Sequence, residues 1–300
     1  MERAKPIGRA PACYFPAVTV SVRPIVVIMA AIAAGCAPPS LQQLADANRY
    51  AADMRVQFTK TGDAANRSVM ADTDEASVAF AREADQAASA AEKDSRDLRP
   101  ILDQLRFSAE IRLLDQFDKQ FADYRTLDRN ILGLAVENTN LKAQRLSFGP
   151  VRGAADMFAS SLESAVGAQP SPARALAETA IAAVREIQVL QAPHIAESSD
   201  EAMTGLEKEM TDAEQRARRA LAALAPMLPP ASRGGIAAAG TALDHVVELN
   251  RQIIDLSRRN TNVRSLALSL GQKRMMAAAC DDTLRALQDA LGKHEFSASR

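Results

Sequence analysis

Two asparagines and two cations occupy matching positions in a repeated stretch of this chain, and they are the side chains best suited to bind a ligand. Asn138 and Asn260 fall at position a of a heptad pattern, and Lys142 and Arg264 fall at position e beside it. An amide in a helical seam fixes the register of the helices at some cost in stability, or else it lines a polar pocket. A cation there can hold a carboxylate or bridge to a neighbouring helix. These four residues form the predicted ligand-binding site. The register role is favoured for the asparagines, so Asn260→Leu is expected to raise the melting temperature.

Side chains spaced for catalysis or metal binding are not found in the sequence. His194, His245 and His294 lie far apart, and none is at ligand spacing from another histidine or cysteine. Cys280 shares one helical face with Leu284, which is typical of a small core residue rather than a reactive thiol. A Gly-rich phosphate loop, a nucleophile elbow and a triad signature are also missing. The sequence therefore predicts no enzymatic activity, no metal and no cofactor.

The stretch Phe121–Gly149 is an internal repeat, since a similar sequence recurs without a gap 122 positions later as Leu243–Gly271. Such self-similarity decides how the rest of the chain is divided. The residues that recur unchanged in the second copy are Leu127, Arg129, Ile131, Leu134, Asn138, Thr139, Asn140, Leu146, Ser147 and Gly149.

Both copies follow one heptad, which predicts a long helix with a narrow buried seam. In the first copy Tyr124 and Ile131 take position a, and Leu127 and Leu134 take position d. The repeat also extends upstream, more faintly, as far as the acidic clusters around Asp74 and Asp200. We therefore predict an all-α protein made of two tandem, elongated, antiparallel four-helix bundles. Their expected bounds are 41–167 for repeat 1, 168–172 for a linker, 173–291 for repeat 2 and 292–300 for a C-terminal tail.

Capping and helix-breaking residues set the expected helix ends. Capping-box patterns at Asp72–Glu75 and Ser198–Glu201 predict a helix start at the same place in each copy. Pro100 is expected in the first turn of a third helix that runs to Phe148. Gly149-Pro150 in the first copy, and Gly271 in the second, are expected to end that helix.

The N-terminal residues have the pattern of an export signal. Basic residues precede an apolar run over Pro24–Gly35, and the run ends at Cys36. Ala33-Ala34-Gly35-Cys36 resembles the lipobox of bacterial lipoproteins, in which the cysteine is lipidated and becomes the new N-terminus. We predict a signal peptide at 1–35 and a tether at 36–40. The alternative is a single transmembrane anchor over Phe15–Ala34, although Arg23 and Pro24 interrupt it. Both interpretations predict a bacterial cell-envelope protein facing the periplasm, with the outer membrane favoured over the inner.

Composition narrows the range of partners. The chain has 36 Lys and Arg against 37 Asp and Glu, with both signs interspersed, so nothing indicates nucleic acid. It has no tryptophan and its aromatic content is 4%, which favours closely packed helices with cores of alanine, leucine and isoleucine.

These features together resemble the periplasmic four-helix-bundle sensor domain of methyl-accepting chemotaxis proteins, taken twice. The resemblance rests on the helix that opens at Asp72–Ala76, the corner Leu98–Leu102, and a long helix that ends in Asn138–Ala143 and Leu146–Gly149. Arg259–Gly271 carries the same pattern in the second copy. The chain ends at Arg300 without a signalling coiled coil, so the resemblance implies a binding module rather than a complete receptor.

The sequence therefore predicts an exported, lipid-anchored, sensor-like module that takes part in signal transduction. It would bind a small organic ligand or an envelope protein partner, and it would pair with a second copy in some arrangements. The alternative is a helical spacer or adaptor lipoprotein with no small-molecule ligand.

Overall fold

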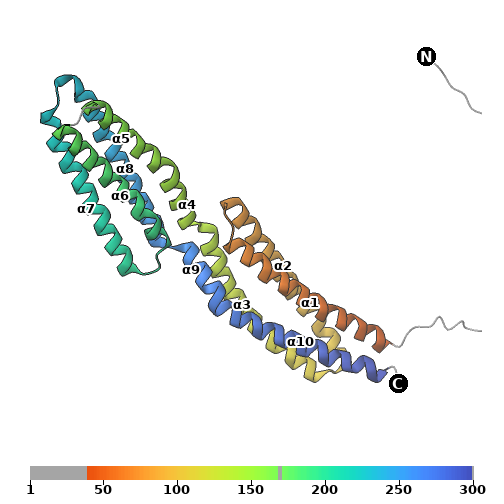
Figure 1. The fold of residues 1–300 in the computed structure, drawn as a ribbon. Coiled ribbons are helices and arrows are strands. Elements are labelled where there is room, and N and C mark those ends of the chain that lie inside the picture. Colours follow the sequence, from red (N-terminus) through yellow and green to blue (C-terminus); the bar gives the residue numbers. More distant parts are fainter. Residues whose placement is uncertain (1–38, 168–170, 299–300) are drawn as a thin grey trace, which may run out of the picture. The chain divides into compact units, whose positions relative to one another are not determined.

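A computed structural model describes residues 39–167 and 171–298, and every regular element in these ranges is helical (Figure 1). This confirms the all-α prediction. The predicted signal peptide, the lipidated Cys36 and most of the tether lie outside the described residues. Within the described ranges, no helix combines the length and the apolar character that a bilayer crossing requires.

The helices follow one another in the same order in the two halves of the chain. Those of the first half are α1 (Pro39–Val69), α2 (Asp74–Leu105), α3 (Ser108–Glu137), α4 (Thr139–Leu146), a π turn (Ser147–Val151) and α5 (Arg152–Val166). Those of the second half are α6 (Pro172–Ala196), α7 (Asp200–Leu224), short 3-10 turns at Ala225–Met227 and Pro230–Ser232, α8 (Arg233–Arg259), α9 (Thr261–Leu268), a π turn (Ser269–Lys273) and α10 (Arg274–Ala298). Because α10 runs to Ala298, the tail predicted at 292–300 is in large part helix.

Helices start at the predicted place in both halves, but each N-cap lies one residue after the first residue of the predicted capping box. The Thr73 side chain accepts a hydrogen bond from the backbone N–H of Ala76 and begins α2. Ser199 accepts one from the N–H of Ala202 and begins α7. Each cap satisfies one of the N–H groups that a helix start leaves unpaired.

Three predicted helix boundaries are wrong, and one of them is Gly271, which lies inside the π turn Ser269–Lys273 that leads directly into α10. Pro100 lies inside α2, which continues to Leu105, because the fully buried Leu98 and Leu102 keep that helix packed on both sides of the proline. The corner falls instead at Arg106, whose φ of 60° is left-handed. Gly149-Pro150 does not end its helix either, since the π turn absorbs both residues and leads directly into α5.

The predicted pairing of helices into bundles is also wrong. One hydrophobic core joins α1, α2 and α3 to α10, and a second joins α6, α7 and α8 to α4 and α5. Repeat 1 therefore does not fold on itself over 41–167, nor does repeat 2 over 173–291, because each gives its last helix to the other's bundle. The physical reason is the break at Asn138, where a single non-helical residue separates α3 from α4. A reversal of direction needs a longer loop. We call the group with α1–α3, α9 and α10 the first bundle, and the group with α4–α8 the second bundle.

The buried stripe of α3 differs in part from the predicted seam. Tyr124 and Ile131, at position a, are fully buried as expected. Leu127 and Leu134, at position d, are only half-buried, and Asp128 is buried instead. A helix in a four-helix bundle contacts two neighbours, so its buried face is wider than a coiled-coil seam. One consequence is that a carboxylate enters the core.

Cys280 is confirmed as a core residue, since it packs with leucines of α10 in the first bundle, and burial raises the pKa of its thiol to about 12.

Candidate functional site

Asn138 and Asn260 lie where the two halves of the chain cross. Asn138 ends α3 and precedes α4, with φ of 50°, and Asn260 ends α8 and precedes α9, with φ of 52°. Asparagine is one of the few residues other than glycine that adopts this left-handed conformation at low cost. Both residues are buried, but they break helices and do not continue a heptad seam.

The two helices that begin at this crossing cap each other. The N–H of Thr139 donates to Thr261 Oγ at 3.2 Å, and the N–H of Thr261 donates to Thr139 Oγ at 3.1 Å. The N–H of Asn140 donates to Asn262 Oδ1 at 3.1 Å, and the reverse bond measures 3.2 Å. The first N–H groups of α4 and α9 are thus satisfied by side chains from the other repeat. We call these paired residues, 138–140 and 260–262, the crossover.

The asparagine side chains complete the crossover. Asn140 Nδ2 donates to Asn260 Oδ1 at 2.8 Å, and Asn262 Nδ2 donates to Asn138 Oδ1 at 2.9 Å. Asn260 also donates to the backbone carbonyl of Glu197 at 2.7 Å, just past the end of α6. The amide oxygens of Asn138 and Asn260 therefore join the two repeats at the crossover, whereas Asn138 Nδ2 has no hydrogen-bond partner among the described residues.

The two predicted cations do not meet. Lys142 Nζ donates to the backbone carbonyl of Glu137 at 2.7 Å, which satisfies a carbonyl at the end of α3. The Arg264 side chain is exposed and makes no hydrogen bond or ion pair with another described residue, whereas its backbone N–H donates to the carbonyl of Asn260 at 3.0 Å. Of the four predicted site residues, the structure brings together the two asparagines and leaves the cations separate.

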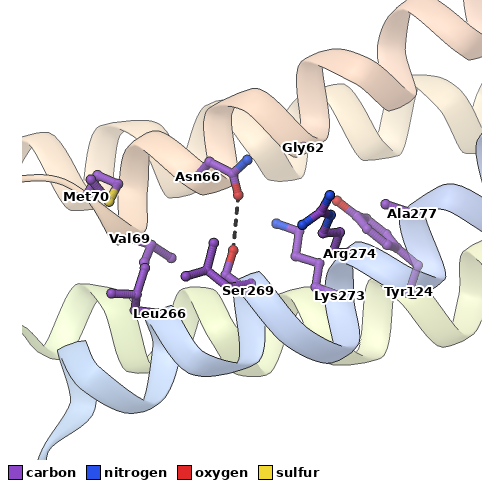
Figure 2. A pocket seen from close by; sticks show the side chains of 11 residues that line it. Gly62, Asn66, Val69, Met70, Tyr124, Leu266, Ser269, Lys273, Arg274 and Ala277 are labelled. Atoms are coloured by element: carbon purple, nitrogen blue, oxygen red, sulfur yellow. Dashed lines mark hydrogen bonds between the residues drawn. The ribbon is translucent and has the colours of Figure 1, made fainter.

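A pocket that the sequence did not indicate lies in the first bundle, between α1, α3 and the segment from α9 to α10 (Figure 2). Its volume is about 360 Å³, within the range of small-molecule sites. The π turn Ser269–Lys273 forms one wall, and such turns occur often at functional sites. The lining residues are Gly62, Asn66, Val69, Met70, Tyr124, Leu266, Ser269, Leu270, Lys273, Arg274 and Ala277.

The deep end of the pocket holds buried polar groups that lack partners. The Lys273 side chain is 4% exposed and lies 2.6 Å from the carboxylate of Asp128, which is fully buried. Beyond this ion pair, neither Lys273 Nζ nor the Asp128 carboxylate has a hydrogen-bond partner within the described residues, and Tyr124 Oη has none at all. Burial raises the pKa of Asp128, although the ammonium of Lys273 opposes that rise, and burial also raises the pKa of Tyr124. Unpaired buried polar groups are costly, so this cluster calls for an explanation.

The rim of the pocket is largely apolar. Met70 and Leu270 are 73% and 66% exposed, which is unusual for side chains of this size. Ser269 Oγ donates to Asn66 Oδ1 at 3.1 Å, the hydrogen bond drawn in Figure 2. Gly62 lies above Tyr124, and a β-carbon built at Gly62 would stand 3.9 Å from the tyrosine hydroxyl. A methyl group at Gly62 would therefore contact this hydroxyl, which is buried beneath the pocket.

The second bundle carries no such cluster at the equivalent place. The positions of Tyr124, Asp128 and Lys273 are taken there by Val246, Asn250 and Val151. The polar groups that remain are paired. Gln191 Nε2 donates to Asn250 Oδ1 at 2.8 Å, and Ser147 Oγ donates to Gln191 Oε1 at 2.7 Å. The unpartnered charges are therefore a feature of one bundle and not of the repeat.

A buried histidine in the second bundle resembles a catalytic triad only in its order of contacts. His194 Nδ1 lies 2.8 Å from Ser257 Oγ, and Nε2 lies 2.9 Å from a Glu207 carboxylate oxygen. Ser257 is fully buried, however, and its hydroxyl donates to the backbone carbonyl of Ile253, so it is not placed to attack a substrate. Arg258 donates to the same Glu207 oxygen at 2.6 Å, and the hydrogen bonds from Arg258 and His194 lower the pKa of Glu207.

Over the described residues, the chain is an all-α helical-bundle protein with a pocket in its first bundle. No family model, curated protein or solved structure gives a match to this chain. The function is therefore argued from the pocket itself.

Proposed function

We propose that this chain is an exported, lipid-anchored binding module, similar to a chemoreceptor sensor domain, that takes a small molecule into the pocket of its first bundle. The observation that carries the proposal is the cluster of Tyr124, Asp128 and Lys273, whose polar groups are buried beneath an apolar-walled pocket and, apart from the ion pair of Asp128 with Lys273, have no hydrogen-bond partner among the described residues. A ligand head group at this place would supply the missing hydrogen bonds.

The second bundle supports this function, because it has the same arrangement of helices without the cluster. A bundle of this type needs no buried ion pair for stability, since replacing such a pair by apolar residues is often neutral or stabilising. Retention of Asp128 and Lys273 in one bundle is most simply explained by a function. The closeness of the pocket to the crossover also suits a sensor, because α9 lines the pocket at Leu266 and begins at Thr261, which is bonded to the other bundle.

A thermal-shift screen with amino acids, organic acids and aliphatic acids tests the proposal. A compound that binds the native state raises the melting temperature, by an amount that grows with its concentration. The control is the variant Tyr124→Val/Asp128→Asn/Lys273→Val, which carries the residues found at the equivalent positions of the second bundle and is therefore expected to fold. The proposal requires a compound that shifts the wild type and not this variant. A panel without a single such compound would contradict it.

A partner-binding adaptor is the second candidate, and exposed apolar residues favour it. Phe148 and Val189 of the second bundle are 70% and 71% exposed and line one shallow groove together with Arg152 and Arg185. Apolar side chains set among cations are typical of protein contact surfaces. Crosslinking in the native envelope would favour this function if Phe148→Ser abolished a specific crosslink while the pocket variant left it intact.

A further inference from the structure

We infer that the ligand of the first bundle is an amphipathic anion, with a single anionic head group on an aliphatic tail. This inference rests on the proposed binding function and adds the chemical class of the ligand. A ligand of this class differs from amino acids and from compounds with several carboxylates. Sites that bind such compounds need more fixed charges than this pocket provides.

The charged side chains around the pocket favour a ligand with one negative charge. Lys273 and Arg274 are the only charged side chains among the pocket's lining residues. Lys273 is paired with Asp128 below the floor, whereas Arg274 is exposed and makes no ion pair with another described residue. Asp63 acts on Tyr124 from nearby, but it is exposed to solvent and lies outside the lining. One cation is left uncompensated, which matches one anionic group on the ligand.

The second argument is the type of polar group that is available. Lys273, the Tyr124 hydroxyl and the Arg274 guanidinium all present N–H or O–H donors. The only unpartnered acceptors in the cluster belong to Asp128, which already faces Lys273. A head group rich in acceptors therefore fits, whereas an ammonium group would meet two cations. This excludes amines and disfavours amino acids.

The third argument is the apolar wall. Val69, Met70, Leu266, Leu270 and Ala277 line the pocket, and Met70 and Leu270 are strongly exposed at its rim. Figure 2 shows Met70, Val69 and Leu266 grouped at one end of the pocket, with Lys273, Arg274 and Tyr124 toward the other. A molecule with its head near the cations would place an aliphatic tail against these side chains. The tail is what makes burial of this surface favourable.

Calorimetric titration of the mature protein with acetate, butanoate and hexanoate tests whether the aliphatic tail contributes to binding. Affinity is expected to rise by up to about fourfold for each added methylene group. 1-Hexanol and hexylamine keep the tail and change the head, and both are expected to bind at least roughly tenfold more weakly than hexanoate, because charged hydrogen bonds are lost. Equal affinity for acetate and hexanoate, or for hexanol and hexanoate, would overturn the inference.

Two matched variants locate the effect. Arg274→Gln is expected to weaken hexanoate binding roughly tenfold, and Arg152→Gln, at the equivalent position of the first repeat and in the second bundle, is expected to leave it unchanged. Equal losses in both variants would mean that binding is not at this pocket and would overturn the inference. If succinate or glutamate binds instead, with the same sensitivity to the triple pocket variant, the proposed function stands and the amphipathic class is wrong. If no compound binds, both are wrong.

Discussion

Thr139 and Thr261 each accept the other's backbone N–H, at 3.2 and 3.1 Å, although they belong to different copies of the repeat. Their hydroxyl oxygens lie 3.1 Å apart, so the two threonines form one closed unit at the point where the helices change bundles. Because each bundle takes its last helix from the other repeat, this unit ties the two cores together.

The first prediction concerns this unit. Thr261→Val removes the acceptor for the Thr139 N–H and is expected to lower the free energy of unfolding by about 1–2 kcal/mol, the usual cost of a lost helix cap. Thr211→Val is the control, because that exposed hydroxyl bonds only to a carbonyl of its own helix. Urea denaturation measures both. Equal effects of the two substitutions would mean that the reciprocal caps contribute nothing.

The second prediction reverses the one made from the heptad pattern. Asn260→Leu is expected to lower the melting temperature, because leucine is strained at φ of 52° and cannot replace the bonds to Asn140 and Glu197. The expected loss is roughly 2–4 kcal/mol. Asn260→Gly keeps the backbone conformation accessible and should lose less, since only the side-chain bonds disappear. A rise in melting temperature for the leucine variant would restore the seam interpretation.

The third prediction concerns the buried ion pair. Lys273→Val leaves the Asp128 carboxylate buried without its partner, and it is expected to cost about 3–5 kcal/mol in unfolding free energy. Asp128→Asn/Lys273→Val introduces the residues found at the equivalent positions of the second bundle and is expected to be close to wild type or more stable. A double variant that is as unstable as the single one would show that the pair is needed for folding, and this would weaken the functional explanation of its retention.

The fourth prediction concerns Gly62. Gly62→Ala is expected to raise the free energy of unfolding by about 0.5–1 kcal/mol, because alanine is the better helix former and meets no clash. The added methyl group would stand over the Tyr124 hydroxyl and is expected to weaken ligand binding in calorimetry. Gly205→Ala, on exposed α7 surface, should stabilise without this loss. Unchanged ligand affinity in Gly62→Ala would place the head group elsewhere.

The fifth prediction concerns acid stability. The pKa of Glu207 is lowered in the folded state, mainly by Arg258, so its contribution to stability is present above its ordinary pKa of 4.5 and is lost as the pH falls below that value. Glu207→Gln should therefore narrow the difference in stability between neutral and acidic pH. Glu209 is exposed on the same helix, and Glu209→Gln is expected to leave the difference in stability between neutral and acidic pH unchanged. Thermal melts between pH 7 and pH 3 compare them, and the raised pKa of Asp128 acts equally in both variants.

Local features of the fold could be predicted from the sequence, whereas the route of the chain could not. The caps at Thr73 and Ser199 and the burial of Cys280 follow from short-range patterns, and each is confirmed. The exchange of helices depends on Asn138, where one left-handed residue decides whether the chain turns back or runs on. Hydrophobic periodicity is the same in both cases, so it carries no information on this choice.

The pocket was not predicted from the sequence, because its residues come from both repeats. Asp128 was visible as an acid beside the seam, but its partner Lys273 lies in the other repeat and reaches the first bundle only because α10 crosses over. The equivalent of Lys273 in the first repeat is Val151, and this difference between the copies was the one available signal. A comparison of the repeats for a charge opposite an apolar residue would have singled out Lys273, whereas Asp128 is matched by the polar Asn250.

The most direct test of the central claim is calorimetric titration of hexanoate into the wild type and into Tyr124→Val/Asp128→Asn/Lys273→Val, after circular dichroism has shown that both are folded. The account predicts saturable binding to the wild type and none to the variant. Equal binding to both proteins, or binding to neither, would contradict it.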